Sequence, residues 1–282
     1  MSIAVSVAKA GLVRGRSELR HTFTNFQDLW GYVFPAGILL VVMLLQRGAT
    51  VGPTGFSLGA TTLPGAIGMS IAFSGLMSVA AQLITEREDG TLLRNKAIPH
   101  GMTGYMIGKI VLTIGMSVVS LLLLLIPGMI IFDGVQMGIA GAVTLVWVFV
   151  LGMAATMPIG AVIGSLFSNP TSMGFVMLPM MGLIGISGIF YPIGKFPEWL
   201  QGIAEVFPIY WLGLGMRSSM LPDSLASVEI GQSWRHLETF GVLGAWAVLG
   251  LVLAPIVLRR MARRESGSAV ASRRERAISR RG

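Results

Sequence analysis

The sequence contains no cysteine and few charged residues. Without cysteine, the chain can form neither a disulfide framework nor a thiolate metal site. Asp, Glu, Lys and Arg make up only 12% of the 282 residues, whereas about a quarter of an ordinary soluble domain is charged. So few charges cannot cover a water-exposed surface, and an ordinary soluble protein is excluded. The net charge of +8 does not indicate nucleic-acid binding, because that function needs a soluble basic face.

Motifs for catalysis and for ion coupling are also missing. A P-loop needs G-x-x-x-x-G-K-[ST], but Lys109 and Lys195, the lysines of two Gly-Lys pairs, are followed by Ile110 and Phe196. The histidines are isolated, and neither H-E-x-x-H nor G-x-S-x-G occurs, so no metal or hydrolytic site is expected. An ion-driven antiporter needs a carboxylate at membrane depth, and the apolar runs hold essentially no ionisable residue near their midpoints. An enzyme and an ion-driven transporter are therefore both disfavoured.

Apolar residues dominate the chain instead, at 53%, together with 37 glycines. A helix needs roughly 20 consecutive apolar residues to cross a bilayer. The segments that meet this requirement are 29–45, 63–84, 105–132, 139–167, 173–190 and 240–258. The expected fold class is therefore an all-α membrane protein with six transmembrane helices.

The N-terminal segment has a different pattern. Apolar residues recur through residues 9–30 at helical spacing, with charged residues between them; they are Leu12, Leu19, Phe23, Phe26 and Trp30. This pattern predicts an amphipathic helix in the inner membrane interface. A soluble helix that packs on a partner is the alternative. The expected organisation is a cytoplasmic N-terminus with this helix over 1–28, a transmembrane domain over 29–258 and a basic disordered tail over 259–282.

The distribution of Lys and Arg predicts the orientation. With the N-terminus inside, all but four of the 21 basic residues lie on the inner side. Both termini are therefore expected on the cytoplasmic side of a bacterial inner membrane. The exceptions are Arg47, Lys195, Arg217 and Arg235. The segment 191–237 then lies outside. It is too apolar for a solvated loop and is broken by prolines, so short re-entrant helices are expected between the fifth and sixth spans.

A polar strip runs along the second span. Ser70, Ser74, Ser78 and Gln82 are spaced by four residues, so they share one face of a helix. Small residues allow membrane helices to approach closely, which makes helix packing one interpretation. A polar lining of a substrate path is the other, and the two are compatible at a dimer seam.

The segment between the second and third spans concentrates charges of both signs. Its residues of interest, here called the elbow, are Glu86, Arg87, Glu88, Asp89, Gly90, Thr91, Leu92 and Arg94. Three acids stand within four residues, and the rule that places basic residues inside does not require them. The elbow is therefore predicted to dock on a soluble partner. A solvated loop without a partner is the alternative.

Two segments of the chain resemble type-2 ATP-binding-cassette (ABC) exporter permeases of the drug-resistance kind that includes daunorubicin exporters. The family pattern E-R-E-x-G-T, then leucines and a proline, is similar to "EREDGTLLRNKAIP". The family's outer re-entrant region is similar to "SGIFYPIGKFPEWLQGIAEVFPIYW". The interfacial helix and the six spans agree as well, so the resemblance covers nearly the whole chain. Asp89 departs from the pattern by adding a third acid.

The resemblance implies a transport subunit that lacks its own nucleotide site. Such a subunit moves an amphiphilic drug, natural product, lipid or peptide out of the cell, with a second permease chain, identical or related. ATP and Mg are bound by two copies of a separate ABC ATPase, which dock on the elbows, and the elbow residues transmit the ATP-driven closure. For the outer segment, the resemblance implies an exit gate formed by Phe190, Tyr191, Pro192, Trp199, Tyr210 and Trp211. A non-transporting membrane scaffold or a lipid-handling protein is the alternative function.

Overall fold

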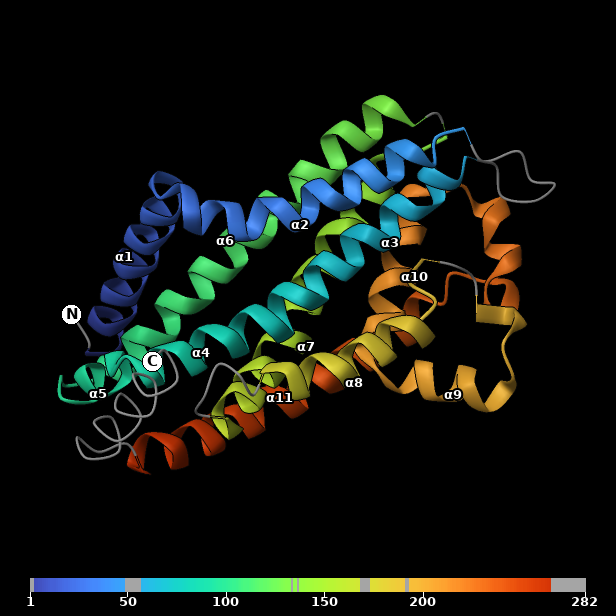
Figure 1. Ribbon diagram of the computed structural model, residues 1–282. Helices are drawn as coiled ribbons and strands as arrows, with labels where there is room; N and C mark the ends of the chain where they lie inside the picture. Colours follow the sequence, from blue (N-terminus) through green and yellow to red (C-terminus); the bar gives the residue numbers. More distant parts are fainter. Residues whose placement is uncertain are drawn as a thin grey trace, which may run out of the picture.

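Five helices form the body of the protein. The computed structural model describes residues 3–48, 57–132, 134–135, 137–167, 173–190 and 193–264, and its elements in these ranges are helical. The helices long and apolar enough to cross a membrane are Phe26–Leu45 (α2), Leu58–Glu88 (α3, η2 and α4 together), Gly101–Ile131 (α6), Ile139–Leu166 (α7) and His236–Arg263 within α11. They run side by side along the molecule (Figure 1). The prediction of an all-helical membrane protein is confirmed.

Shorter helices lie at the two ends of this body. Figure 1 shows α1 (Ile3–Thr24), α5 (Thr91–Lys96) and the end of α11 (His236–Arg264) together at one end, called here the elbow end. The opposite end, called the cap, contains α9 (Glu198–Val206) and α10 (Pro208–Met220). The cap also contains the short helices Ile193–Lys195 (η4), Asp223–Val228 (η5) and Ile230–Gln232 (η6).

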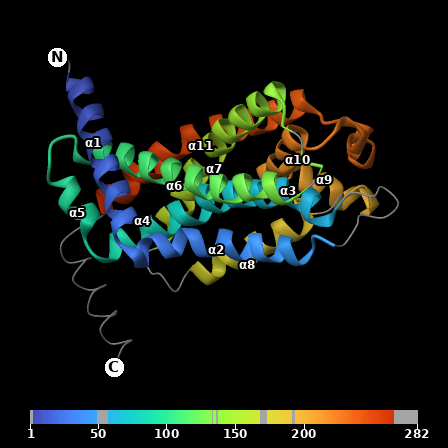
Figure 2. The same ribbon diagram turned by 90° about the horizontal axis from the view of Figure 1, so that it is seen from above.

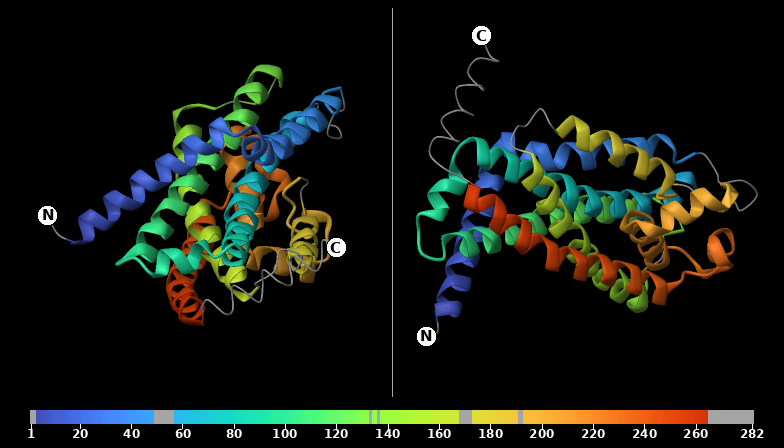
Figure 3. Two further views of the ribbon diagram at one scale, coloured as in Figure 1. Left: turned by 60° about the vertical axis from the view of Figure 1, so that its left-hand side comes forward. Right: turned by 90° about the horizontal axis from the view of Figure 1, so that it is seen from below.

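The N-terminal helix ends earlier than predicted. The sequence pattern suggested one amphipathic helix over residues 9–30, but α1 ends at Thr24 and α2 begins at Phe26. Asn25 separates them with an extended backbone, and its side chain accepts a hydrogen bond from the backbone N–H of Gln27. This N-cap starts a new helix, so Phe26 and Trp30 belong to the first span. Figure 3 shows α1 projecting across the bundle instead of continuing α2.

The segment predicted as the fifth span is a shorter helix. We expected a helix over 173–190, but α8 (Met173–Ile186) has 14 residues and is not among the five long helices. Gly188 follows with a φ of +61°, a left-handed conformation that ends a helix. Arg217 of α10 then donates to the backbone carbonyls of Gly188 and Ile189, at 3.0 and 3.5 Å. These contacts hold the chain after α8 inside the cap.

The second span packs on α7 through small residues. A Cβ added at Gly164 would lie 2.8 Å from the carbonyl oxygen of Ala80, and one at Gly160 would lie 2.6 Å from that of Leu76. Backbones this close need glycine at the contact. The same span contains a π-helical turn, Ser74–Ser78 (η2), between α3 (Leu58–Phe73) and α4 (Val79–Glu88).

Candidate functional site

The elbow is a tight helical corner. Asp89 ends α4, and Gly90 turns the chain with a φ of +79°, which costs glycine little. The Asp89 carboxylate accepts a hydrogen bond from the backbone N–H of Thr91 at 2.8 Å and so satisfies the first backbone donor of α5. Leu92 is buried against Leu83 and the end of α11, in a cluster that includes Leu258. The corner is therefore held by packing as well as by its turn.

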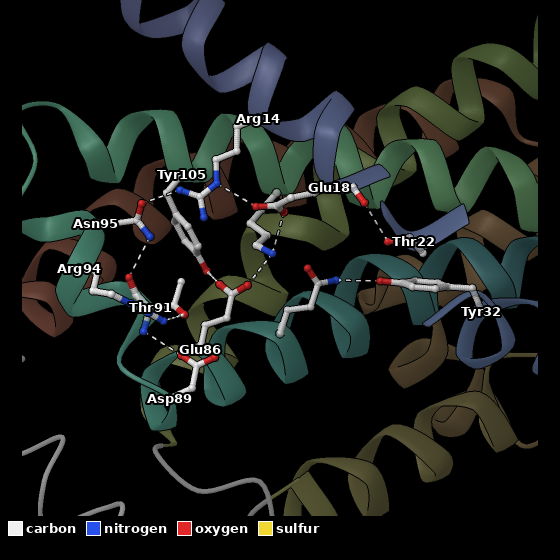
Figure 4. A network of polar contacts seen from close by, with 12 residues as sticks. Arg14, Glu18, Thr22, Tyr32, Glu86, Asp89, Thr91, Arg94, Asn95 and Tyr105 are labelled. Atoms are coloured by element: carbon white, nitrogen blue, oxygen red, sulfur yellow. Dashed lines mark hydrogen bonds and ion pairs between the residues drawn. The ribbon is translucent and has the colours of Figure 1, made fainter. Parts of the chain in front are cut away.

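Glu86 is the elbow residue with the strongest tertiary contacts. Its Oε1 lies 2.5 Å from Nζ of Lys109, and its Oε2 accepts a hydrogen bond from the hydroxyl of Tyr105, both on α6. Lys109 Nζ also lies 2.9 Å from Oε2 of Glu18 on α1. The Glu18 carboxylate in turn accepts a hydrogen bond from Arg14 Nε at 2.8 Å. These contacts join α1, α4 and α6 through one lysine (Figure 4).

A second branch of this network reaches α5. Arg14 donates from Nη1 to Oδ1 of Asn95 at 2.5 Å, and Asn95 donates to the carbonyl of Thr91 at 2.9 Å. The Arg14 guanidinium also lies 5.2 Å from the centre of the Tyr105 ring, a cation–π contact. We call Arg14, Glu18, Glu86, Tyr105 and Lys109 the brace. Arg14 of α1 thus contacts α5 directly, and Glu18 of α1 is linked to α4 through Lys109 of α6.

The brace is partly shielded from solvent and balanced in charge. The side chains of Glu86, Lys109 and Glu18 are 16%, 17% and 25% exposed. Burial raises the pKa of Glu18, but hydrogen bonds and charges from Arg14 and Lys109 outweigh burial and hold that pKa below its ordinary value. The Glu18 carboxylate is therefore ionised at neutral pH. Two cations then face two carboxylates.

Glycines allow α1 to pack closely on α6 beside the brace. A Cβ added at Gly11 or Gly15 of α1 would lie 2.6 Å from the Cβ of Ile107 or Val111. On α6, a Cβ added at Gly108 would lie 3.3 Å from the Arg14 side chain. This close approach brings the Glu18 carboxylate within reach of the Lys109 ammonium group. The N-terminal helix is thus bound to the body of the protein.

The remaining elbow residues divide into two groups. Arg87 donates to the carbonyls of Ser165 and Phe167 at 2.9 and 2.6 Å, where a cation suits the C-terminal end of α7. Glu88 is half-buried. The tip of the elbow is exposed and continues past the elbow residues to His100; it comprises Asp89, Arg94, Lys96, Ala97, Ile98, Pro99 and His100. The elbow therefore combines a braced inner side with an exposed tip that carries both charge and an apolar side chain, Ile98.

The polar strip of the second span is not a uniform helical face. Ser74 is buried, whereas Ser70, Ser78 and Gln82 are half-buried. The π-helical turn starts at Ser74 and widens the helix, so the spacing of four no longer keeps one face through the strip. Gln82 donates to the hydroxyl of Tyr32 on α2 at 3.1 Å. π-Helical turns occur frequently at functional sites.

The predicted outer gate residues separate in the structure. Tyr210 and Trp211 are buried in the cap, Phe190 is half-buried, and Trp199 is 67% exposed on α9. Tyr191 and Pro192 lie outside the described residues. The indole of Trp211 donates to the carbonyl of Glu205 at 2.6 Å. The structure thus groups Tyr210 and Trp211 and leaves Trp199 on the surface.

Most residues of the brace were missed by sequence reasoning. Glu18 and Lys109 are 91 residues apart and meet only through the packing of α1 on α6. Lys109 carried one signal, because it is a lone lysine inside a predicted apolar span. The span is longer than it needs to be: α6 has 31 residues and is about 46 Å long, whereas a hydrocarbon core is about 30 Å thick. A helix of this length has room for turns outside the hydrocarbon core, where a lysine costs little.

A comparison with known families gives one match. The model of a family described as "ABC-2 family transporter protein" matches residues 53–256 of the chain. The matched range includes the elbow, α6 with Lys109 and the cap. Among curated proteins, none matches this chain.

Proposed function

Because this chain belongs to the ABC-2 family of transporter proteins, it is a permease component of an ABC transporter, and we propose that it works as an exporter. In this proposal it moves an amphiphilic drug, natural product, lipid or peptide out of the cell. A separate ABC ATPase, present in two copies, binds ATP and Mg and supplies the energy. The apolar helices of the body suit a substrate that partitions into the membrane.

The elbow is the proposed docking surface for the ATPase. The observation that carries this assignment is the brace, in which Lys109 contacts Glu86 of the elbow and Glu18 of α1. A movement imposed on the exposed tip would pass through Glu86 into α6 and α1. The buried contact of Leu92 with α11 offers a second route into the body. A solvated loop without a partner needs neither connection.

A second permease chain is proposed to pack along α2 and α8. Both helices lie on the same side of the molecule (Figure 2). Glycines on them face open space, since a Cβ added at Gly31, Gly37, Gly174 or Gly182 would meet no atom within 4 Å. Such positions allow another helix to approach closely. The chain offers fewer such positions on α7, where Gly152, Gly160 and Gly164 already contact neighbouring helices.

The elbow end is proposed to face the cytoplasm and the cap the outside of a bacterial inner membrane. The support is the excess of Lys and Arg at the elbow end, together with the length of α6 beyond the hydrocarbon core. In this orientation α9 and α10 form the re-entrant segment that narrows the exit. A reporter fused after Leu221 should read as external, and one fused after Gly282 as cytoplasmic; a cytoplasmic signal at Leu221 would contradict the orientation.

Co-purification tests the proposed function. The tagged chain is isolated in mild detergent, and bound soluble proteins are identified by mass spectrometry. We expect a P-loop ATPase, in an amount that falls at least fivefold for Ile98→Asp. Trp199→Asp is the matched control, because Trp199 is an exposed apolar residue at the opposite end. Recovery of no ATPase with the unmodified chain would favour a membrane scaffold or a lipid-handling protein instead.

A further inference from the structure

Polar residues continue from the brace into the body of the protein. On α6, Thr113 and Ser117 follow Lys109 at intervals of four residues, so they lie on the same side of the helix. On α4, Gln82 lies one turn from Glu86 in the direction of the cap. Lys109 and Glu86 contact each other, and α4 runs toward the elbow end whereas α6 runs away from it (Figure 1), so the next polar residues on both helices lie on the cap side of this ion pair.

Several atoms of this region are buried without a hydrogen-bond partner. Thr113 and Ser117 are 1% and 2% exposed. In the part of the chain that the structure describes, neither hydroxyl has a hydrogen-bond partner, and the same is true of Oε1 of Gln82. An unsatisfied buried polar group costs about 1–3 kcal/mol. Three such groups therefore destabilise the protein unless a small polar ligand bonds to them.

The surroundings of these atoms suit water as that ligand. A buried water bonds to roughly three polar groups, and this region offers hydroxyls, an amide oxygen and the Tyr32 hydroxyl that already accepts from Gln82. The π-helical turn Ser74–Ser78 packs against α6 just above Gln82. A ligand much larger than water would not have room here, since the side chains are almost completely enclosed by the chain itself.

We propose that a hydrated polar seam runs between α2, α4 and α6, from the brace toward the π-helical turn. Its ligand is a short row of water molecules bonded to Gln82, Thr113 and Ser117. The water keeps the brace in a polar environment on its inner side. Separating Glu86 from Lys109 then costs less than it would in a dry interior, because the attraction between two charges weakens as the local dielectric constant rises. The seam lets the elbow move without breaking an ion pair in an apolar medium.

Single cysteines provide the test, since the chain has none of its own. Thr113→Cys and Ser117→Cys report on the seam. Their matched controls are Ile114→Cys and Val118→Cys, one residue further along α6 and each 37% exposed on the outer side of the helix. The full-length protein in lipid vesicles is treated with hydrogen peroxide, a polar oxidant little larger than water, which oxidises a thiolate to sulfenic acid. The rate of modification is measured by mass shift.

We expect both seam cysteines to react at least tenfold faster than both controls. Seam rates as slow as those at Ile114 and Val118 would overturn the proposal and would mean that the hydroxyls bond to the backbone of their own helix in a dry interface. If one seam variant does not yield folded protein, the other decides the result. The measurement needs neither ATPase nor substrate, so its outcome is independent of the proposed export function.

Discussion

Replacing Lys109 with methionine removes the cation that lies between two carboxylates. Nζ of Lys109 lies 2.9 Å from Glu18 and 2.5 Å from Glu86. Methionine keeps most of the length and volume of the side chain, so packing on α6 is preserved. The variant leaves Glu18 with Arg14 and leaves Glu86 with only the Tyr105 hydroxyl among its described partners.

The expected loss of stability follows from burial. Removing one partner of a fully buried ion pair costs about 3–5 kcal/mol, and hydrogen bonds to charged groups contribute about 1.5–3 kcal/mol. Because the side chains of the brace remain 16–25% exposed, the lower range applies, and we expect a loss of about 2–3 kcal/mol. At about 2–4 °C of Tm for each kcal/mol, the Tm should fall by about 4–12 °C.

Thermal unfolding of the purified protein in detergent measures this loss. Lys109→Met with Glu86→Gln is the decisive second variant, because it also removes the carboxylate left without its cation. We expect the double variant to recover at least half of the lost Tm, which is the non-additivity of residues in contact. An unchanged Tm in Lys109→Met, or a further fall on adding Glu86→Gln, would refute the brace as a coupled unit.

Three further predictions concern other contacts. Gly15→Ala should destabilise the protein by about 1–3 kcal/mol through overpacking against α6, whereas Gly104→Ala, where an added Cβ meets no atom within 4 Å inside a helix, should not lower the Tm. Arg217→Met should cost about 3–5 kcal/mol by leaving Glu229 buried without its cation, and equal Tm values for variant and parent would contradict a role of this pair in holding the cap. The lowered pKa of Glu18 contributes stability above its ordinary pKa of 4.5 that is lost as the pH falls through the lower folded value. Glu18→Gln should therefore flatten the decline of Tm measured from pH 7 to pH 3, and an unchanged decline would contradict the assignment.

The parts predicted well from sequence depend on local composition. Long apolar runs must cross the membrane as helices because the bilayer offers their backbone groups no hydrogen bonds, and the structure contains five such helices where the sequence predicted spans. The elbow follows from the same reasoning, because it is the charged interval between two runs. The break at Asn25 was also readable, since asparagine is a strong N-cap residue, but the apolar periodicity through Trp30 concealed it.

The parts that were missed depend on contacts distant in sequence. Hydropathy continues through Phe190, yet α8 ends at Ile186, because Gly188 adopts a left-handed conformation and Arg217 binds the carbonyls that follow. No local sequence pattern predicts that Arg217 makes these contacts. The brace has the same character: Lys109 and Glu18 come together only when glycines let α1 approach α6. Side-chain networks of this kind follow from the packing of helices and not from periodicity.

The central claim is that the tip of the elbow contacts a separate ATPase. Cysteine at Ile98, with cysteine at Trp199 as the control at the opposite end, tests it most directly in a chain that has no cysteine of its own. A thiol-to-amine crosslinker is added to membranes that contain the ATPase. The account predicts a crosslinked permease–ATPase product from Ile98→Cys that changes in yield when ATP is added, and none from Trp199→Cys. Crosslinks to the ATPase that are equally abundant from both positions, or absent from Ile98→Cys, would contradict it.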